Sequence, residues 1–228
     1  MNTVNITRLK SGVCLIGSLR EIGSNSLNHE VPLGEVLDDG PVYGIGMFTG
    51  LRGELLIMES DVRLGEFLGA RDYRIRAANP ADRVAFLAFG RVTQWKELPI
   101  PKRVSQFHDL EQFVPEAAAM AGLDTTDAFF FRIRAGVKYL KWFIVDGMGN
   151  LLPDPRASFE RARYLGGLDD TEIDALGVYS PGVKGVFTNA VSHIHLHFRT
   201  TRGDDFVGHI DDEILLEPGG SIYFGVNG

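Results

Sequence analysis

The chain has 228 residues, a formal net charge of −7 and a single cysteine. One cysteine excludes an internal disulfide framework, and an acidic chain without a basic stripe is not expected to bind nucleic acid. No apolar run approaches the roughly 18–20 residues that a membrane span needs, and no secretory signal peptide is evident. We therefore expect a cytoplasmic protein without a membrane partner, long enough to bury a full core as one large domain or two small ones.

Most of the sequence predicts strands, because glycine is abundant (27 residues) and the apolar runs are short. Cys14 lies in one such run and is expected at a buried strand position. A turn at residues 50–53 separates two strands, so Glu54 begins the second arm of a hairpin. Strands are expected at residues 42–48, 54–58, 84–92, 192–200, 209–216 and 221–226.

Three other stretches carry different signals. Residues 109–120 have apolar side chains at helical spacing, and Ser105 or Asp109 is expected to cap that helix. Residues 128–145 predict a long hairpin broken at 135–136. Residues 151–174 are polar and contain prolines, which predicts a connecting region with a short helix at 157–163.

Two histidines alternate within an apolar stretch near the C-terminus, and a third follows. On a strand, His195 and His197 lie on one face with Cα atoms roughly 7 Å apart, so both imidazoles can reach one ion at Zn–N distances of about 2.0–2.1 Å. His209, on the next expected strand, completes a site with open positions, as in catalytic rather than structural zinc sites. An H-x-H pair alone is also typical of a surface or of hydrogen-bonded core residues. His193 has the same strand parity and is a possible ligand, a supporting group or polar filling.

Two blocks of the sequence resemble those of the α-acetolactate decarboxylases. The block from Tyr43 to Leu55 is similar to the family's G-x-G-T-F-x-x-L-D-G-E motif, and the block from His195 to Asp212 is similar to its H-L-H-F…G-G-H-V-L-D motif. Residues 131–141 match the family's I-R-I…Y-V-K segment more weakly. The order and approximate spacing agree across about residues 33–216.

This resemblance implies a single domain over residues 1–228, mainly β with a few helices (α+β), in which two β-sheet modules hold a metal site in the cleft between them. It implies that His195, His197 and His209 bind Zn²⁺, or another divalent first-row metal, and that Glu54 and Arg132 are catalytic. The implied activity is that of a carboxy-lyase, which converts 2-acetolactate, or a closely related 2-hydroxy-3-keto acid, to acetoin and CO₂. We also expect a homodimer.

The chain departs from the family pattern in several places. The interval between the second and third histidines is one residue longer, the loop at 201–208 differs, and Arg52 replaces an aspartate. The family's C-terminal glutamate has no obvious counterpart before Gly228. A gapless alignment with the family places Arg132 at the position of the family's arginine. An alignment anchored on Gly136 places Ile133 there instead.

The chemistry of these residue types suits such a reaction. Loss of CO₂ beside a ketone leaves negative charge that a Lewis acid stabilises. Arg132 can hold a carboxylate by a bidentate contact, and Glu54 can transfer protons or bind the metal. Without the resemblance, the two residues would be read as a solvated strand residue and a residue that follows a turn.

Three functional classes are compatible with the sequence: the decarboxylase, a metal-dependent isomerase or cyclase on the same scaffold in a biosynthetic pathway, and a non-catalytic metal or small-ligand binding protein.

Strand alternation places Phe130 on the face of Arg132, as a cleft residue, and Phe129 and Phe131 in the core. Phe206, in the altered loop, is expected to cover the metal. We therefore expect a bulkier or less polar keto acid to be turned over at least as well as acetolactate.

Overall fold

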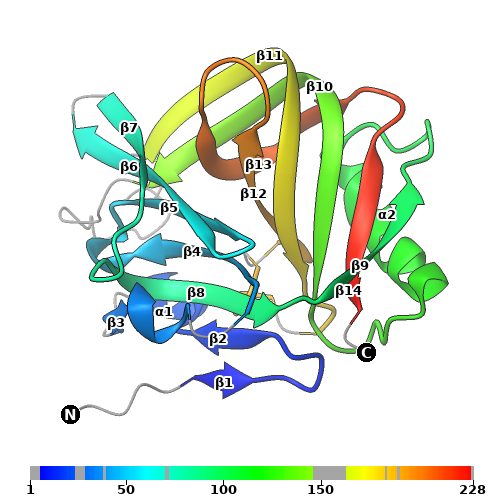
Figure 1. The fold of residues 1–228 in the computed structure, drawn as a ribbon. Coiled ribbons are helices and arrows are strands. Elements are labelled where there is room, and N and C mark those ends of the chain that lie inside the picture. The colour runs from blue at the N-terminus through cyan, green and yellow to red at the C-terminus, as the bar shows by residue number, and fades with distance from the viewer. Residues whose placement is uncertain are drawn as a thin grey trace.

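Two antiparallel β-sheets form most of the protein (Figure 1). The computed structural model describes residues 6–23, 29–37, 40–69, 72–145, 163–182, 184–188 and 191–226. The first sheet has the order β1-β2-β8-β4-β5-β6-β7, with β3 paired to β8. Its strands are β1 (Thr7–Arg8), β2 (Cys14–Ile16), β3 (Val31–Pro32), β4 (Val42–Phe48), β5 (Gly53–Met58), β6 (Asp61–Gly69), β7 (Asp72–Ala77) and β8 (Arg83–Arg91). The expected mainly β architecture is confirmed.

The second sheet has the order β11-β12-β13-β10-β14-β9, and β11 also pairs with β10, so that four of its strands close into a ring. Its strands are β9 (Gln94–Pro99), β10 (Phe129–Val145), β11 (Arg163–Tyr179), β12 (Ile194–Thr200), β13 (Val207–Leu216) and β14 (Ser221–Val226). The helices are α1 (Leu19–Gly23) and α2 (Phe107–Ala121), with the 3₁₀ turns η1 (Leu33–Glu35) and η2 (Thr49–Leu51). None of the helices in the described parts of the chain has the length and apolar character to cross a membrane.

The strands expected from local pattern are present, with boundaries shifted by at most two residues. Cys14 is buried in β2, as predicted. The hairpin of β4 and β5 places Met47 opposite Glu54. Its connection requires left-handed backbone at Gly50, where φ is 75°, a conformation that glycine adopts without steric cost.

The expected hairpin at 128–145 is wrong, because β10 is one continuous strand of 17 residues. Gly136 does not form a turn. A Cβ atom there would lie 2.4 Å from Oε2 of Glu217, so the glycine leaves space for a side chain that packs over the strand. A glycine in a strand often marks such a close approach rather than a turn.

The expected connecting region at 151–174 is also wrong from residue 163 onward, because residues 163–179 form β11. Residues 151–162 lie outside the described part of the chain, and they include all but the last residue of the helix expected at 157–163. Gly166 lies within strand β11. Its missing side chain makes room for the indole of Trp142 on β10, because a Cβ atom would lie 2.4 Å from Cε2 of that ring.

Helix α2 occurs where its apolar spacing predicts, but Gln106 is the N-cap residue rather than Ser105 or Asp109. The Asp109 carboxylate accepts hydrogen bonds from the backbone N–H groups of Ser105 and Gln106, so it still stabilises the start of the helix. Gly122 ends the helix in the left-handed conformation, with φ of 89°.

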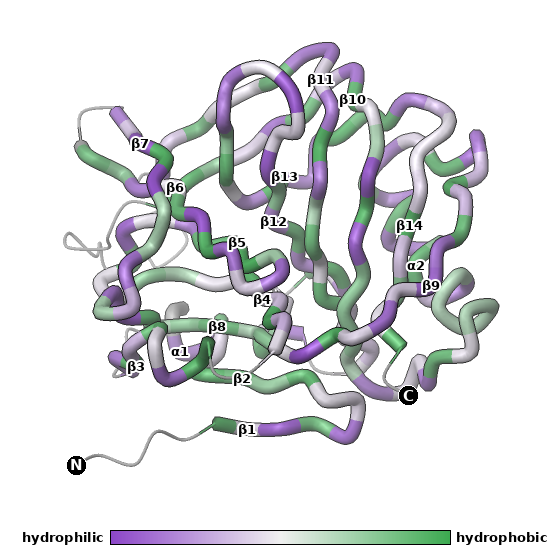
Figure 2. The backbone as a smooth tube through the Cα atoms, in the orientation of Figure 1, coloured by the Kyte–Doolittle hydropathy of each residue, from purple (hydrophilic) through white to green (hydrophobic). Residues whose placement is uncertain are grey.

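Three apolar clusters divide the molecule into layers. Leu55 and Ile57 face outward from the first sheet, whereas Leu56 faces the second sheet and packs in a shared cluster with Phe130 and Leu176. A third cluster lies on the other face of the second sheet and includes the buried side of α2. Figure 2 shows the hydrophobic character of β2 and β8 and the hydrophilic outer ends of β10 and β11. The layering fixes which residues of each strand can meet between the sheets.

Candidate metal centre

Three histidines of the second sheet converge on one point between the sheets. On β12, alternate apolar residues face the core cluster under α2, so His195 and His197 face the first sheet. His209 on β13 is the direct cross-strand partner of His197. One ring nitrogen from each histidine lies within 4.8 Å of those of the other two, and Nε2 of His195 is 3.0 Å from both Nε2 of His197 and Nδ1 of His209. The structure therefore brings together the three predicted ligands.

Backbone carbonyls fix the orientation of two of these rings. Nδ1 of His195 donates a hydrogen bond to the carbonyl of Phe187 at 2.8 Å, and Nδ1 of His197 donates to the carbonyl of Leu55 at 2.8 Å. A carbonyl oxygen can only accept, so each Nδ1 carries the proton and each neutral ring presents an Nε2 lone pair. These two lone pairs face each other without a proton between them. A cation at that point turns this repulsion into attraction, and histidines on metals usually donate their other N–H to such a carbonyl.

The electrostatic surroundings keep the three rings neutral. Burial lowers the pKa of His195 to about 4. Burial, followed by the neighbouring His195, holds the pKa values of His197 and His209 well below the usual range. Neutral imidazole is the form that binds a metal. The donor set thus fits Zn²⁺ or another first-row divalent ion.

Glu54 reaches the same point from the first sheet. It lies on the face of β5 that is turned toward the second sheet, and its side chain is fully buried. Its Oε1 accepts a hydrogen bond from the N–H of Val145 at 3.4 Å. Its Oε2 is 3.3 Å from Nε2 of His197 and has no hydrogen-bond partner among the residues that the structure describes. A buried, unsatisfied carboxyl oxygen beside three imidazoles is the strongest sign that this centre takes a further group.

Burial also raises the pKa of Glu54 to about 8. In the absence of a nearby cation the carboxyl therefore holds a proton near neutral pH, so it can act as an acid. A bound divalent ion favours the ionised form instead. The residue can thus either hold a proton beside the centre or contribute an oxygen ligand.

Arg132 is buried, but the contacts that the structure describes do not join it to the histidines. Its guanidinium binds the buried carboxylate of Asp174 by two hydrogen bonds, from Nε to Oδ1 at 2.6 Å and from Nη2 to Oδ2. Its Nη1 lies 3.7 Å from the exposed carboxylate of Glu59, at the turn between β5 and β6. Leu176 separates Arg132 from His197 in the cross-strand row. Arg132 therefore lies on the same face of the second sheet as the metal centre, two strands away from His197.

Two further expectations about nearby residues have different outcomes. Phe130 packs between the sheets, whereas Phe129 and Phe131 lie in the core cluster under α2, as strand alternation predicts. Phe206 does not cover the metal centre. Its ring packs against Trp142 and Tyr73, with ring centroids 5.7 Å and 6.3 Å away, because it has the opposite strand parity to His209 and belongs to the other core cluster.

His193 does not join the three-histidine group, because its Nδ1 lies 3.0 Å from the carbonyl oxygen of Ser180.

Sequence reasoning missed Asp174, which was assigned to a connecting region. An available signal was its position as a single acid in the apolar run from Ile173 to Val178, since a buried acid usually has a charged partner. The carbonyls that orient the imidazoles gave no signal in the sequence.

Comparisons with known proteins identify the family of this chain. The family model of alpha-acetolactate decarboxylase matches residues 15–218. The structure is similar to that of alpha-acetolactate decarboxylase from Bacillus subtilis strain 168, with a TM-score of 0.68 and 20% sequence identity over 93% of this chain and 85% of that one. It is also similar to a Staphylococcus aureus protein of unknown function that resembles alpha-acetolactate decarboxylase, with a TM-score of 0.71 and 15% identity over 93% and 84% of the two chains.

The acetolactate decarboxylase of Bacillus subtilis subspecies spizizenii gives a TM-score of 0.68 and 18% identity over 94% of this chain and 85% of that one. No curated protein sequence matches this chain significantly. At these identities the solved structures support the fold, and the family model adds a match across most of the sequence. The chain belongs to the α-acetolactate decarboxylase family.

Proposed function

We propose that the protein is a metal-dependent decarboxylase of 2-acetolactate, or of a closely related 2-hydroxy-3-keto acid. The observation that carries the proposal is the convergence of three neutral imidazoles with a buried, unsatisfied carboxyl from the opposite sheet. Such a centre has ligands for a cation and a proton-transfer group beside it. Family membership directs this chemistry to the loss of CO₂.

The imidazoles of His195, His197 and His209 would hold Zn²⁺ or a similar ion. Bound there, the ion acts as a Lewis acid toward the negative charge that develops on the substrate oxygens. In the reaction, the bond between the carboxylate carbon and its neighbour breaks and CO₂ leaves. The electron pair passes to the adjacent ketone, and a proton added at carbon gives the hydroxyketone. Glu54, whose Oε2 lies 3.3 Å from Nε2 of His197, would supply that proton.

Arg132 would hold the substrate carboxylate through the part of its guanidinium that Asp174 does not use. Nη1 makes no hydrogen bond with a described residue and points to the turn of Glu59. This role requires the substrate to extend from the histidines toward Arg132, past Leu176. The packing of Phe206 on the other face removes one of the two reasons to expect a bulkier substrate, so acetolactate itself is the first substrate to test.

The test is to incubate the zinc-loaded protein with racemic 2-acetolactate and to measure acetoin and CO₂ together. We expect both products in equal amounts, their loss on chelation and their return when zinc is added back. The Glu54→Gln variant serves as a control for non-enzymatic breakdown of the substrate. Stoichiometric zinc without acetoin would overturn the proposal and favour the isomerase, the cyclase or the non-catalytic binding protein.

The expected homodimer is a separate prediction, which light scattering of the purified protein would test.

A further inference from the structure

A groove with about 500 Å³ of open space lies on the second sheet, along the face that carries the histidines. Its lining includes Arg134 on β10, Asp174 on β11, Arg199 on β12 and Gly220 in the turn before β14. Arg199 follows His197 by two residues, so the two side chains leave the same face of the strand, with Cα atoms roughly 7 Å apart. The groove is therefore a neighbour of the metal centre and has its own set of side chains.

Positive charge dominates the floor of this groove. Asp174 is 2% exposed, and both of its oxygens already accept hydrogen bonds from Arg132. Nε of Arg134 and Nη2 of Arg199 each lie 3.5 Å from the same Oδ2 atom. Three guanidinium groups thus surround one carboxylate, and that carboxylate neutralises only one of them.

The other acids around the groove have cationic partners of their own, and Glu217, which packs over Gly136 of the lining, lies 2.8 Å from Nζ of Lys138. Glu172 lines the groove but lies 3.0 Å from Nη1 of Arg202. Asp61 is 3.1 Å from Nε of Arg63 and only 3.5 Å from Nη1 of Arg199. With these acids included, the charges around the groove are balanced, and the guanidinium groups are concentrated around the single carboxylate of Asp174.

Arg134 is the group best placed to meet a ligand. Its side chain is 53% exposed, and its guanidinium carbon lies 5.9 Å from the ring centroid of Tyr223. It makes no hydrogen bond with any residue in the described ranges, so its two terminal nitrogens still have all their N–H groups available. A guanidinium held over a ring and beside a carboxylate is pre-oriented, which lowers the entropy lost on binding.

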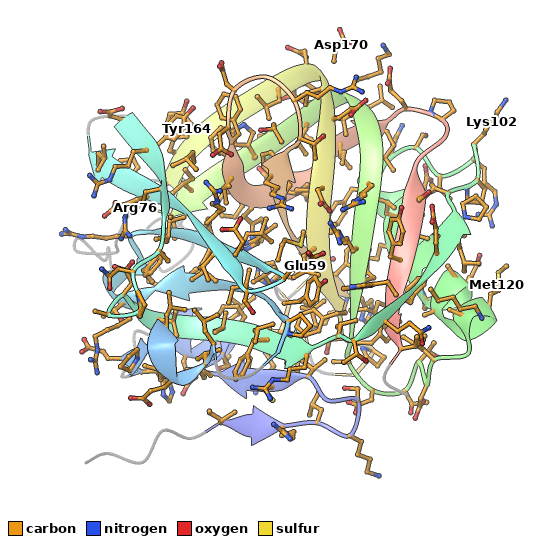
Figure 3. The ribbon with its side chains drawn as sticks, viewed as in Figure 1. Glu59, Arg76, Lys102, Met120, Tyr164 and Asp170 are labelled. Atoms are coloured by element: carbon orange, nitrogen blue, oxygen red, sulfur yellow. The ribbon has the colours of Figure 1, made fainter. Side chains whose placement is uncertain are left out.

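We propose that this groove binds a small molecule through a carboxylate or phosphate group, held by Arg134 and Arg199. Each guanidinium group has paired N–H donors that can bind two oxygens of a carboxylate or phosphate at once. The open space is within the usual range of small-molecule sites, about 300–1,000 Å³. Figure 3 shows Glu59 at the tip of the β5–β6 hairpin, in front of the second sheet. Arg132 is not among the residues that line the groove, so Arg134 and Arg199 are its binding pair.

Calorimetric titration of the zinc-loaded protein with inorganic phosphate, and separately with succinate, tests this site without any turnover. We expect saturable binding of at least one probe, with an affinity that falls about tenfold or more in Arg134→Gln, the usual effect of losing a charge-assisted hydrogen bond. Arg134→Lys keeps the charge without the planar fork and should give an intermediate affinity. Arg103→Gln is the matched control, because Arg103 is also exposed and also lies over a ring, that of Phe113.

Absence of binding to the unaltered protein would overturn the proposal, as would equal affinities in the unaltered protein and Arg134→Gln. An equal loss in Arg103→Gln would show general surface attraction and would also overturn it. None of these results depends on decarboxylase activity, so a failure of this site and a failure of the proposed function are distinguishable.

A second experiment, which rests on the proposed function, asks whether the bound anion is part of the substrate or a separate molecule. It compares the turnover of acetolactate with that of a 2-hydroxy-3-keto acid extended by a terminal carboxylate. A higher kcat/KM for the extended acid that is lost in Arg134→Gln makes the groove a substrate subsite. Binding of phosphate or succinate without that difference makes the groove a site for a separate anion. Either result is compatible with an anion site, whose existence the calorimetry alone decides.

Discussion

The strongest test of the metal centre is its contribution to stability. His209 is the best residue to replace, because its ring makes no hydrogen bond to a backbone carbonyl in the parts of the chain that the structure describes. Replacing His195 or His197 would also leave a backbone carbonyl without its hydrogen-bond donor. The loss of that hydrogen bond could then not be separated from the loss of metal binding. His209→Ala removes one of three ligands and leaves those two carbonyls paired.

The size of the effect follows from linkage between binding and folding. A ligand that binds only the folded state at a hundred times its Kd stabilises that state by about 2.7 kcal/mol. For a chain of 228 residues, each kcal/mol shifts the melting temperature by about 2–4 °C. We therefore expect zinc to raise the Tm of the unaltered, metal-free protein by roughly 5–11 °C, and to raise that of His209→Ala little.

The assay is thermal unfolding followed by circular dichroism, with and without zinc, after chelation. His193→Ala is the matched control, because His193 lies outside the three-histidine group and bonds to Ser180, and it should keep the full shift. The reasoning is refuted if zinc leaves the Tm of the unaltered protein unchanged, or if His209→Ala shows the same shift. Loss of the shift in His193→Ala would mean that the ligand set is wrong.

Three further substitutions test other parts of the structure. Glu54→Gln should keep zinc content and fold but lower kcat by about 10²–10⁴-fold, since it removes a proton-transfer group; steady-state kinetics with unchanged turnover would contradict that role. Asp174→Ala should reduce the free energy of unfolding in urea by about 3–5 kcal/mol, because a buried guanidinium loses its partner. The exposed Asp170→Ala should change the same quantity by less than about 1 kcal/mol, and equal effects would place the buried pair in doubt. Gly166→Ala should cost about 1–3 kcal/mol, because its Cβ would overlap a buried indole. Gly167→Ala, whose nearest neighbour atom is 3.5 Å away, should cost clearly less in the same urea titration, and the reverse order would show that the register of β11 is wrong.

Short-range pattern in the sequence was sufficient for much of the fold. Short apolar runs bounded by turns predicted β4, β5, β8, β12 and β13, and side chains along a strand alternate between its two faces with a period of two residues. The same period placed His195 and His197 on one face and separated Phe130 from its two phenylalanine neighbours. The next expected strand added His209 as a third ligand, and the motif resemblance added Glu54, which no local pattern connects to the histidines.

Pattern failed where a residue serves a partner far away in the chain. Gly136 was interpreted as a break in a hairpin, and Gly166 lies in the stretch expected to be a connecting region, although each leaves room for a side chain outside its own strand. Asp174 was taken for part of a polar connection, although it is the buried partner of Arg132, 42 residues away. Phe206 was expected over the metal, but the parity of β13 turns it to the opposite face.

The chemistry of the site was decided by tertiary structure alone. The sequence shows that three histidines and a glutamate exist, but their protonation depends on burial and on the carbonyls of Phe187 and Leu55. Glu54 takes part because the first sheet packs against the second, which removes its carboxyl from water and turns one oxygen toward the imidazoles. Desolvation and hydrogen bonding depend on three-dimensional surroundings, and no local window of sequence contains them.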